Sequence, residues 1–159
     1  MIESGRDIEL VTWRPELAAD FARLNRAWLE LYFTVEPLDE EYLSDPVGHI
    51  IAPGGEIFFA LDGDEVIGTC AMIPRGDDAF ELAKLAVTPA AQGRGIGRRL
   101  VEAAIGFARR RGAKRVVLVS NSGLGPALRL YERVGFEHGP VPDPRPYVDA
   151  DVFMVLELP

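Results

Sequence analysis

One stretch, Leu85–Arg99, constrains the fold more than any other part of the 159-residue chain. A short apolar run ends at Val87, Thr88-Pro89 stops it, and glycines then occupy every second position from 93 to 97. Beyond the glycines, apolar residues recur at every fourth position, which is typical of an amphipathic helix. The stretch therefore predicts a strand, a glycine-rich turn and the N-terminus of a helix, in that order.

The predicted helix N-terminus favours an anion. Unpaired N–H groups and the helix dipole give it positive charge, and glycines let a backbone approach an anion without a Cβ in the way. Arg94, Arg98 and Arg99 add fixed positive charge. We therefore predict that the turn binds phosphate groups. The alternative is an ordinary glycine-rich turn between a strand and a helix.

The spacing of the glycines excludes two common phosphate-binding motifs. The dinucleotide fingerprint needs glycines at positions one, three and six, and counting from Gly93 the sixth residue is Arg98. The nucleoside-triphosphate loop needs Gly-Lys followed by Ser or Thr, a tripeptide that the sequence lacks. Residues 92–97, Gln-Gly-Arg-Gly-Ile-Gly, instead resemble the Gln/Arg-x-x-Gly-x-Gly/Ala turn of the GNAT superfamily, the acyl-CoA-dependent N-acyltransferases. A second motif, Ala127–Phe136, is similar to the Ala-x-x-Leu-Tyr-x-x-x-Gly-Phe helix of that superfamily.

Periodicity along the chain predicts a single mixed α/β domain over residues 1–159. The expected strands are Ile8–Trp13, Glu56–Leu61, Val66–Ile73, Phe80–Val87, Val116–Val119, one that begins at Gly135, and Asp151–Leu158. The expected helices are Pro15–Phe33, Gly97–Arg111 and Ala127–Val134. The resemblance implies the GNAT fold: a mixed, mostly antiparallel sheet that splays between its fourth and fifth strands, with helices on both faces and acyl-CoA entering the gap.

The resemblance also implies where coenzyme A would bind. The residues concerned are Leu85, Ala86, Val87, Gln92, Gly93, Arg94, Gly95, Ile96, Gly97, Arg98 and Asn121. Backbone groups of Leu85–Val87 would bond the acyl carbonyl and the pantetheine arm where the strand bulges away from its neighbour. Asn121 would contact the cofactor or a bound water, although an asparagine before Ser122-Gly123 is equally suited to a turn or a helix cap.

Two residues match positions with catalytic duties in the superfamily. Glu81, six residues before Val87, would act as the general base, and Tyr131 would act as the general acid that protonates the departing sulfur. Strict alternation along Phe80–Val87 predicts that Glu81 shares a face with Leu85 and Val87. A solvent-facing carboxylate and a core aromatic ring are the alternatives for Glu81 and Tyr131.

The distribution of charge indicates the class of acceptor. The chain has 17 basic and 25 acidic residues, and a net charge of −8 argues against a nucleic-acid surface and attracts cations. Thr34–Pro53 contains five carboxylates and no lysine or arginine, and its prolines predict a loop with a short helix near Asp39–Leu43. The resemblance places this segment over the acceptor site, so we expect it to be an acidic wall beside a cationic or zwitterionic amine, either a small molecule or a peptide. A solvated surface loop is the alternative.

The remaining features bear on whether the protein binds a metal and on where in the cell it is located. Cys70, His49 and His138 are isolated and lack ligand spacing, so we expect no metal. We find neither an apolar run of about 18 residues nor a basic segment followed by an apolar one at the N-terminus, and we expect a cytoplasmic protein without a membrane span. A single cysteine in an apolar run suits a reducing compartment.

Together these features predict an acetyl-CoA-dependent N-acetyltransferase, with acetyl-CoA as cosubstrate and direct attack by the amine in a ternary complex. The alternative is a non-catalytic module that binds acyl-CoA as a sensor; the presence of both Glu81 and Tyr131 favours the enzyme. The sequence leaves open the acceptor, whether the acyl group is always acetyl, whether Glu81 or another group is the base, and whether the chain forms a homodimer.

Overall fold

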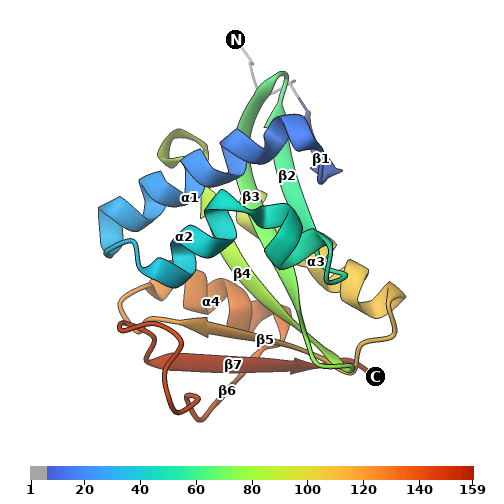
Figure 1. Cartoon of the computed structure of the whole chain (residues 1–159), viewed down its shortest axis with the longest axis vertical. Coiled ribbons are helices and arrows are strands. Elements are labelled where there is room, and N and C mark those ends of the chain that lie inside the picture. The colour runs from blue at the N-terminus through green and yellow to red at the C-terminus, as the bar shows by residue number, and fades with distance from the viewer. Residues whose placement is uncertain (1–6) are drawn as a thin grey trace.

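The computed structural model describes residues 7–159, which form one seven-stranded sheet with helices on both faces (Figure 1). The strands run in the order β1-β2-β3-β4-β5-β7-β6. Their bounds are β1 Ile8–Thr12, β2 Glu56–Asp62, β3 Glu65–Arg75, β4 Ala79–Val87, β5 Arg115–Ser120, β6 Glu137–Gly139 and β7 Val152–Glu157. The sheet that the sequence predicts is confirmed: its pairs are antiparallel except for β4 and β5. The strand predicted to begin at Gly135 begins at Glu137, because Gly135, with φ of 120°, ends the preceding helix.

Two hydrophobic layers enclose the sheet. The helices are α1 Ala18–Tyr32, α2 Pro37–Ser44, α3 Ile96–Arg110 and α4 Gly125–Val134, with short 3-10 turns at Pro15–Leu17 and Pro89–Ala91. Alternation along β2 divides the layers, because Phe58 packs with α3 and α4 whereas Phe59 packs with α1 and α2. None of the helices in the described residues 7–159 is long and apolar enough to cross a membrane.

The segment between α1 and β2 is more helical than its prolines predict. Pro37 occupies the first turn of α2, where its missing N–H costs nothing, and Pro46 precedes a π-helical turn at Val47–Ile51. Asp39 caps α2 by accepting a hydrogen bond from the Glu36 N–H at 2.9 Å. These prolines therefore open helical turns, and the expected loop with a short helix is corrected to two consecutive helical elements.

The pairing of β4 with β5 is short, and this shortness creates a gap in the sheet. Only Ala79–Glu81 pair with Arg115–Val117, so the two strands diverge from that point to their carboxyl ends. Figure 1 shows β4 and β5 close together near the C-terminus and spread apart toward α4. The sheet therefore splays between its fourth and fifth strands, as predicted.

A β-bulge in β4 changes which side chains share a face. Thr69 of β3 pairs with Ala86 and Ala71 pairs with Ala83, so β4 carries one extra residue at Lys84-Leu85. Lys84 has a φ of 58°, a left-handed conformation that is unusual for a residue with a side chain. Beyond the bulge, Leu85 packs toward α3 while Ala83 and Ala86 pack toward α1. The prediction that Glu81 shares a face with Leu85 and Val87 is therefore wrong, because strict alternation does not continue through a bulge.

Candidate active site

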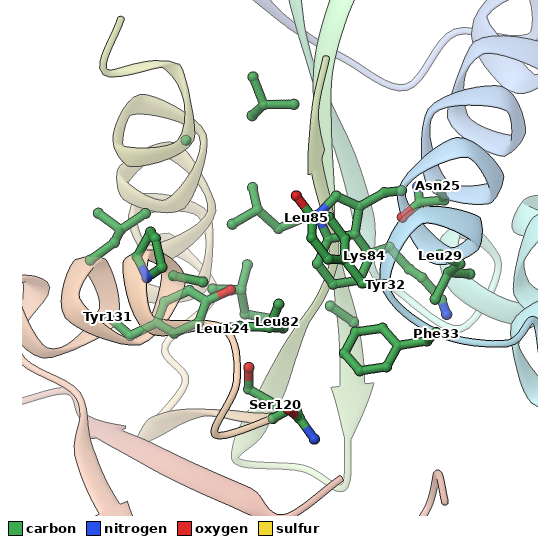
Figure 2. A pocket seen from close by; sticks show the side chains of 18 of the residues that line it. Asn25, Leu29, Tyr32, Phe33, Leu82, Lys84, Leu85, Ser120, Leu124 and Tyr131 are labelled. Carbon is green, nitrogen blue, oxygen red and sulfur yellow. The ribbon is translucent and has the colours of Figure 1, made fainter. Parts of the chain in front are cut away.

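A cavity of about 900 Å³ fills the gap between β4 and β5 (Figure 2). We define its α3 side as the lining residues of the glycine turn, α3 and α4. Its α1 side comprises the lining residues of α1, α2 and the connection between them, together with Lys84 of β4 and the lining residues of the β6–β7 loop. The floor comes from β4, at Glu81–Leu85 and Val87, and from the end of β5 and the next residue, at Val119–Asn121. Both residues that the sequence assigns to catalysis, Glu81 and Tyr131, line this one cavity although they come from different elements.

The glycine turn forms the α3 side. Gly93 and Gly95 have φ values of 84° and 77°, which favour glycine, and a Cβ at either position would meet nothing within 4 Å. Gly95 is also the N-cap of α3. A helix N-terminus therefore opens onto the cavity through residues without side chains, an arrangement suited to a phosphate group. The residues of the predicted turn that line the cavity are Gln92, Gly93, Gly95, Ile96, Gly97 and Arg98.

Two of the residues predicted to bind coenzyme A lie outside the cavity lining. Arg94 points toward the β2–β3 hairpin, where its Nη1 is 3.6 Å from the Asp62 carboxylate. Ala86 is 2% exposed and packs against the α1 and α2 layer, since the bulge turns it away from α3. Its neighbours Leu85 and Val87 do line the cavity. Any contact from Ala86 would therefore come from its backbone.

Glu81 lines the cavity, but a basic side chain holds it. Its Oε1 accepts a hydrogen bond from Arg75 Nε at 2.8 Å and forms an ion pair with Arg75, whose Nη2 is 2.6 Å away. The glutamate side chain is 13% exposed. Arg75 also donates to the Tyr42 hydroxyl at 3.0 Å. Glu81 is therefore part of an ordered polar network rather than an isolated carboxylate among apolar neighbours. Its role as a base stays a prediction.

Tyr131 has a buried ring and a hydroxyl that faces the cavity. The residue is 8% exposed, and its ring packs edge-on against Phe136 at 5.9 Å between centroids. Figure 2 shows the hydroxyl pointing from α4 into the space in front of β4. Burial raises the pKa of this hydroxyl above its ordinary value near 10, so it stays protonated at neutral pH. It is therefore available as a proton or hydrogen-bond donor, and its role as an acid stays a prediction.

Asn121 lines the cavity at the end of β5, and its amide is engaged in local structure. The side-chain oxygen accepts from the Gly123 N–H at 2.8 Å, and Nδ2 donates to the Asp149 carbonyl at 2.7 Å. Ser122 reinforces the same junction, with its N–H and Oγ both within 2.8 Å of Asp151 oxygens. These bonds fit the turn-forming alternative and tie the β6–β7 loop to β5. The predicted contact with a cofactor is untested.

The α1 side contains residues that the sequence analysis did not assign to a site. They are Asn25, Trp28, Leu29, Tyr32, Phe33 and Thr34 from α1 and its C-terminal end, together with Lys84 and Tyr147. The run Trp28–Phe33 contains more large apolar residues than one buried face of a helix needs. This excess could have indicated from the sequence that the end of the helix contributes to a site. Nothing in the sequence indicates that Lys84 and Tyr147 meet.

The predicted acidic wall is smaller than its five carboxylates suggest. Of these carboxylates only Glu36 and Asp39 line the cavity. Asp39 is paired with Lys84, and the two side chains are 3% and 7% exposed. Glu40 faces outward and pairs with Arg26. The sequence alone does not reveal this neutralisation, because the lysine comes from β4, 45 residues away along the chain.

Comparison with known sequences supports the motif assignments. The family model described as Acetyltransferase (GNAT) family matches residues 16–136. A mycothiol acetyltransferase of Rhodococcus erythropolis is 33% identical over 144 residues, which cover 82% of this chain and 46% of that protein. The uncharacterized N-acetyltransferase YjgM of Escherichia coli is 32% identical over 133 residues, or 80% of this chain and 76% of that one. The chain thus spans less than half the length of the Rhodococcus relative.

Solved structures show the same fold. A GNAT-family acetyltransferase from Staphylococcus aureus superposes with a TM-score of 0.87 at 16% identity, covering 96% of this chain and 100% of that one. The N-acetylglutamate synthase of Neisseria gonorrhoeae, complexed with coenzyme A and N-acetyl-glutamate, gives 0.75 at 21% identity, covering 96% of this chain and 35% of that one. The structure of yncA from Salmonella typhimurium, with its cofactor acetyl-CoA, also gives 0.75 at 21% identity, covering 96% and 94%.

Proposed function

Since the chain belongs to the acetyltransferase (GNAT) family, we propose that it transfers the acetyl group of acetyl-CoA to a primary amine. One observation carries the proposal: the splay between β4 and β5 opens a single cavity lined by the glycine turn, Glu81 and Tyr131. Similar structures with acetyl-CoA or coenzyme A bound support the identity of the cosubstrate.

The α3 side fits the phosphates of coenzyme A. Gly93 and Gly95 leave open space where side chains would stand, and the first turn of α3 offers N–H groups and a favourable dipole. Arg98 lines the same region and adds positive charge. The bulge at Lys84-Leu85 interrupts the β3–β4 ladder, so backbone groups of β4 are available for the acyl carbonyl and pantetheine arm.

The reaction needs a proton acceptor on one side of the acyl carbon and a donor on the other. The amine nitrogen forms a bond to the carbonyl carbon, the carbon–sulfur bond breaks, and the sulfur leaves with the bonding pair. Glu81 accepts the proton that the amine loses, directly or through water, and Tyr131 donates a proton or a hydrogen bond to the sulfur. A free thiol has a pKa of about 8.5, so stabilising the departing thiolate is useful near neutral pH.

Assay of both products tests the proposal. Purified protein is incubated with acetyl-CoA and a panel of primary amines, thiol release is followed over time, and acetylated amines are identified by mass spectrometry. We expect thiol release that depends on an amine, together with one acetylated product per amine consumed. Tight binding of acetyl-CoA without turnover on any amine would contradict the enzyme and favour a sensor that only binds acyl-CoA.

A further inference from the structure

Three aromatic rings, those of Trp28, Tyr32 and Phe33, line the α1 side of the cavity. Trp28 contacts Tyr32 and Phe33, with ring centroids 5.3 and 5.5 Å apart, and all three line the cavity beside Leu29. Figure 2 shows Tyr32 and Phe33 reaching from α1 toward β4, across the space from Tyr131. A molecule entering from this side therefore meets a broad apolar surface before it reaches the strands.

The one basic side chain on this side, among the described residues that line the cavity, is already engaged. Lys84 donates to Asp39, and its Nζ lies 5.1 Å from the centre of the Tyr147 ring and 3.4 Å from the Tyr147 hydroxyl. With 7% of its side chain exposed, it is among the few lysines that proteins bury, and such lysines are paired. A carboxylate on an incoming molecule would therefore find no free cation here.

Negative charge on the α1 side is in excess. Glu36 accepts from the Val148 N–H at 3.1 Å, and no basic side chain among residues 7–159 pairs with it. Asp149, at the exposed rim, likewise has no ion-pair partner among those residues. These two carboxylates favour an ammonium group and repel a second carboxylate.

We propose that the acceptor is a primary amine on an aromatic or bulky aliphatic body that carries no carboxylate of its own. The inference rests on the proposed function. The sequence predicts a cationic or zwitterionic acceptor, and the inference narrows this acceptor to a cation. The ring wall of Trp28, Tyr32 and Phe33 would hold the apolar body, and Glu36 and Asp149 would attract the ammonium form before it loses its proton. Free amino acids and polyhydroxylated amines are poor matches, because they bring a carboxylate or hydroxyl groups against these rings.

A matched set of amines tests the proposal. Phenylalanine adds one carboxylate to phenethylamine, and ethanolamine has a hydroxyl in place of the phenyl ring. For each amine kcat/KM is measured with acetyl-CoA saturating. We expect phenethylamine to exceed both others by at least tenfold. A value for phenylalanine or ethanolamine equal to or above that of phenethylamine would overturn the proposal.

Variants of the ring wall locate the effect. Tyr32→Ala and Phe33→Ala should each raise KM for phenethylamine at least tenfold and leave KM for acetyl-CoA within about twofold. Leu31→Ala is the control, because Leu31 lies at the same helix end but is 63% exposed and does not line the cavity. An effect of Leu31→Ala as large as that of Phe33→Ala would contradict the assignment of the wall.

A binding measurement separates this inference from the proposed function. In a Trp13→Phe background Trp28 is the one remaining tryptophan, and its fluorescence reports occupancy of the ring wall in the presence of coenzyme A. Saturable quenching by phenethylamine, at least tenfold tighter than by phenylalanine, supports the inference even if no amine is acetylated. Acetylation of the panel without this preference overturns the inference and leaves the proposed function intact.

Discussion

The two sides of the cavity are built in different ways. The glycine turn on the α3 side is local: lining residues between Ala91 and Arg98 supply the turn and the helix N-terminus, and positive φ at two glycines sets its shape. The α1 side depends on distant pairs, which join Lys84 to Asp39 across 45 residues and Glu36 to Val148 across 112. A motif in the sequence can therefore specify the first side, whereas the second exists only once the chain has folded.

The buried Lys84–Asp39 pair offers the largest expected effect, and it should separate the two sides. Lys84→Met leaves a carboxylate that is 3% exposed without its cation, so the free energy of unfolding should fall by about 3 kcal/mol. Urea denaturation measures this change. At a temperature where the variant is folded, the affinity for coenzyme A should change by less than about threefold, because the α3 side is independent of the pair.

Two controls sharpen the result for Lys84. The double variant Lys84→Met/Asp39→Asn removes both charges and should recover most of the lost stability. Arg26→Met removes the partner of Glu40 in an exposed pair between α1 and α2 and should cost less than about 1 kcal/mol. If Arg26→Met were as destabilising as Lys84→Met, burial would not be what distinguishes the pairs.

Glu81→Gln should reduce kcat by about a hundredfold if Glu81 is the base, because the amide keeps the shape but cannot accept the proton. KM for acetyl-CoA should change little, since Glu81 lies away from the glycine turn. Arg75→Gln is the control for the lost ion pair, because it breaks the same contact and keeps the carboxylate. Equal losses of kcat in the two variants would assign Glu81 to the network and not to proton transfer.

Tyr131→Phe should reduce kcat ten- to a hundredfold and leave coenzyme A affinity and thermal stability nearly unchanged. Among the described residues the Tyr131 hydroxyl makes no hydrogen bond, so its removal leaves no protein group unpaired. Because burial raises the pKa of Tyr131 above 10, the tyrosine itself should cause no loss of activity between pH 7 and pH 10. An unchanged kcat in the folded variant would identify Tyr131 as a core aromatic residue with no part in the chemistry.

The sequence predicted the sheet and the α3 side because both follow from local rules. Apolar periodicity identified the strands, and Gly93 and Gly95 indicated a turn that the structure contains. The sequence did not predict on which face of the sheet the Leu85 side chain lies. One extra residue in β4 at Lys84 reverses the alternation, and nothing in a single sequence marks a bulge at a lysine.

The α1 side was harder to predict for a different reason. Asp39 appeared as one of five free carboxylates, and its neutralisation depends on a lysine that reaches it only in the folded sheet. Pro37 at the start of α2 and Pro46 before the π-helical turn were also ambiguous, since a proline that ends one element can begin another. Long-range pairing therefore limited the prediction of the site more than it limited that of the fold.

The central claim is that the glycine turn binds coenzyme A. The most direct test is calorimetric titration of coenzyme A into two variants, Gly95→Ala and its control Gly112→Ala. Both glycines flank α3 with φ near 75°, and a Cβ meets nothing within 4 Å at either, so the backbone strain should cost a similar 1 kcal/mol or so in each variant. Only Gly95 lines the cavity. Coenzyme A should bind Gly95→Ala at least tenfold more weakly than the wild type and bind Gly112→Ala as the wild type does. Equal affinities for the two folded variants would contradict the claim.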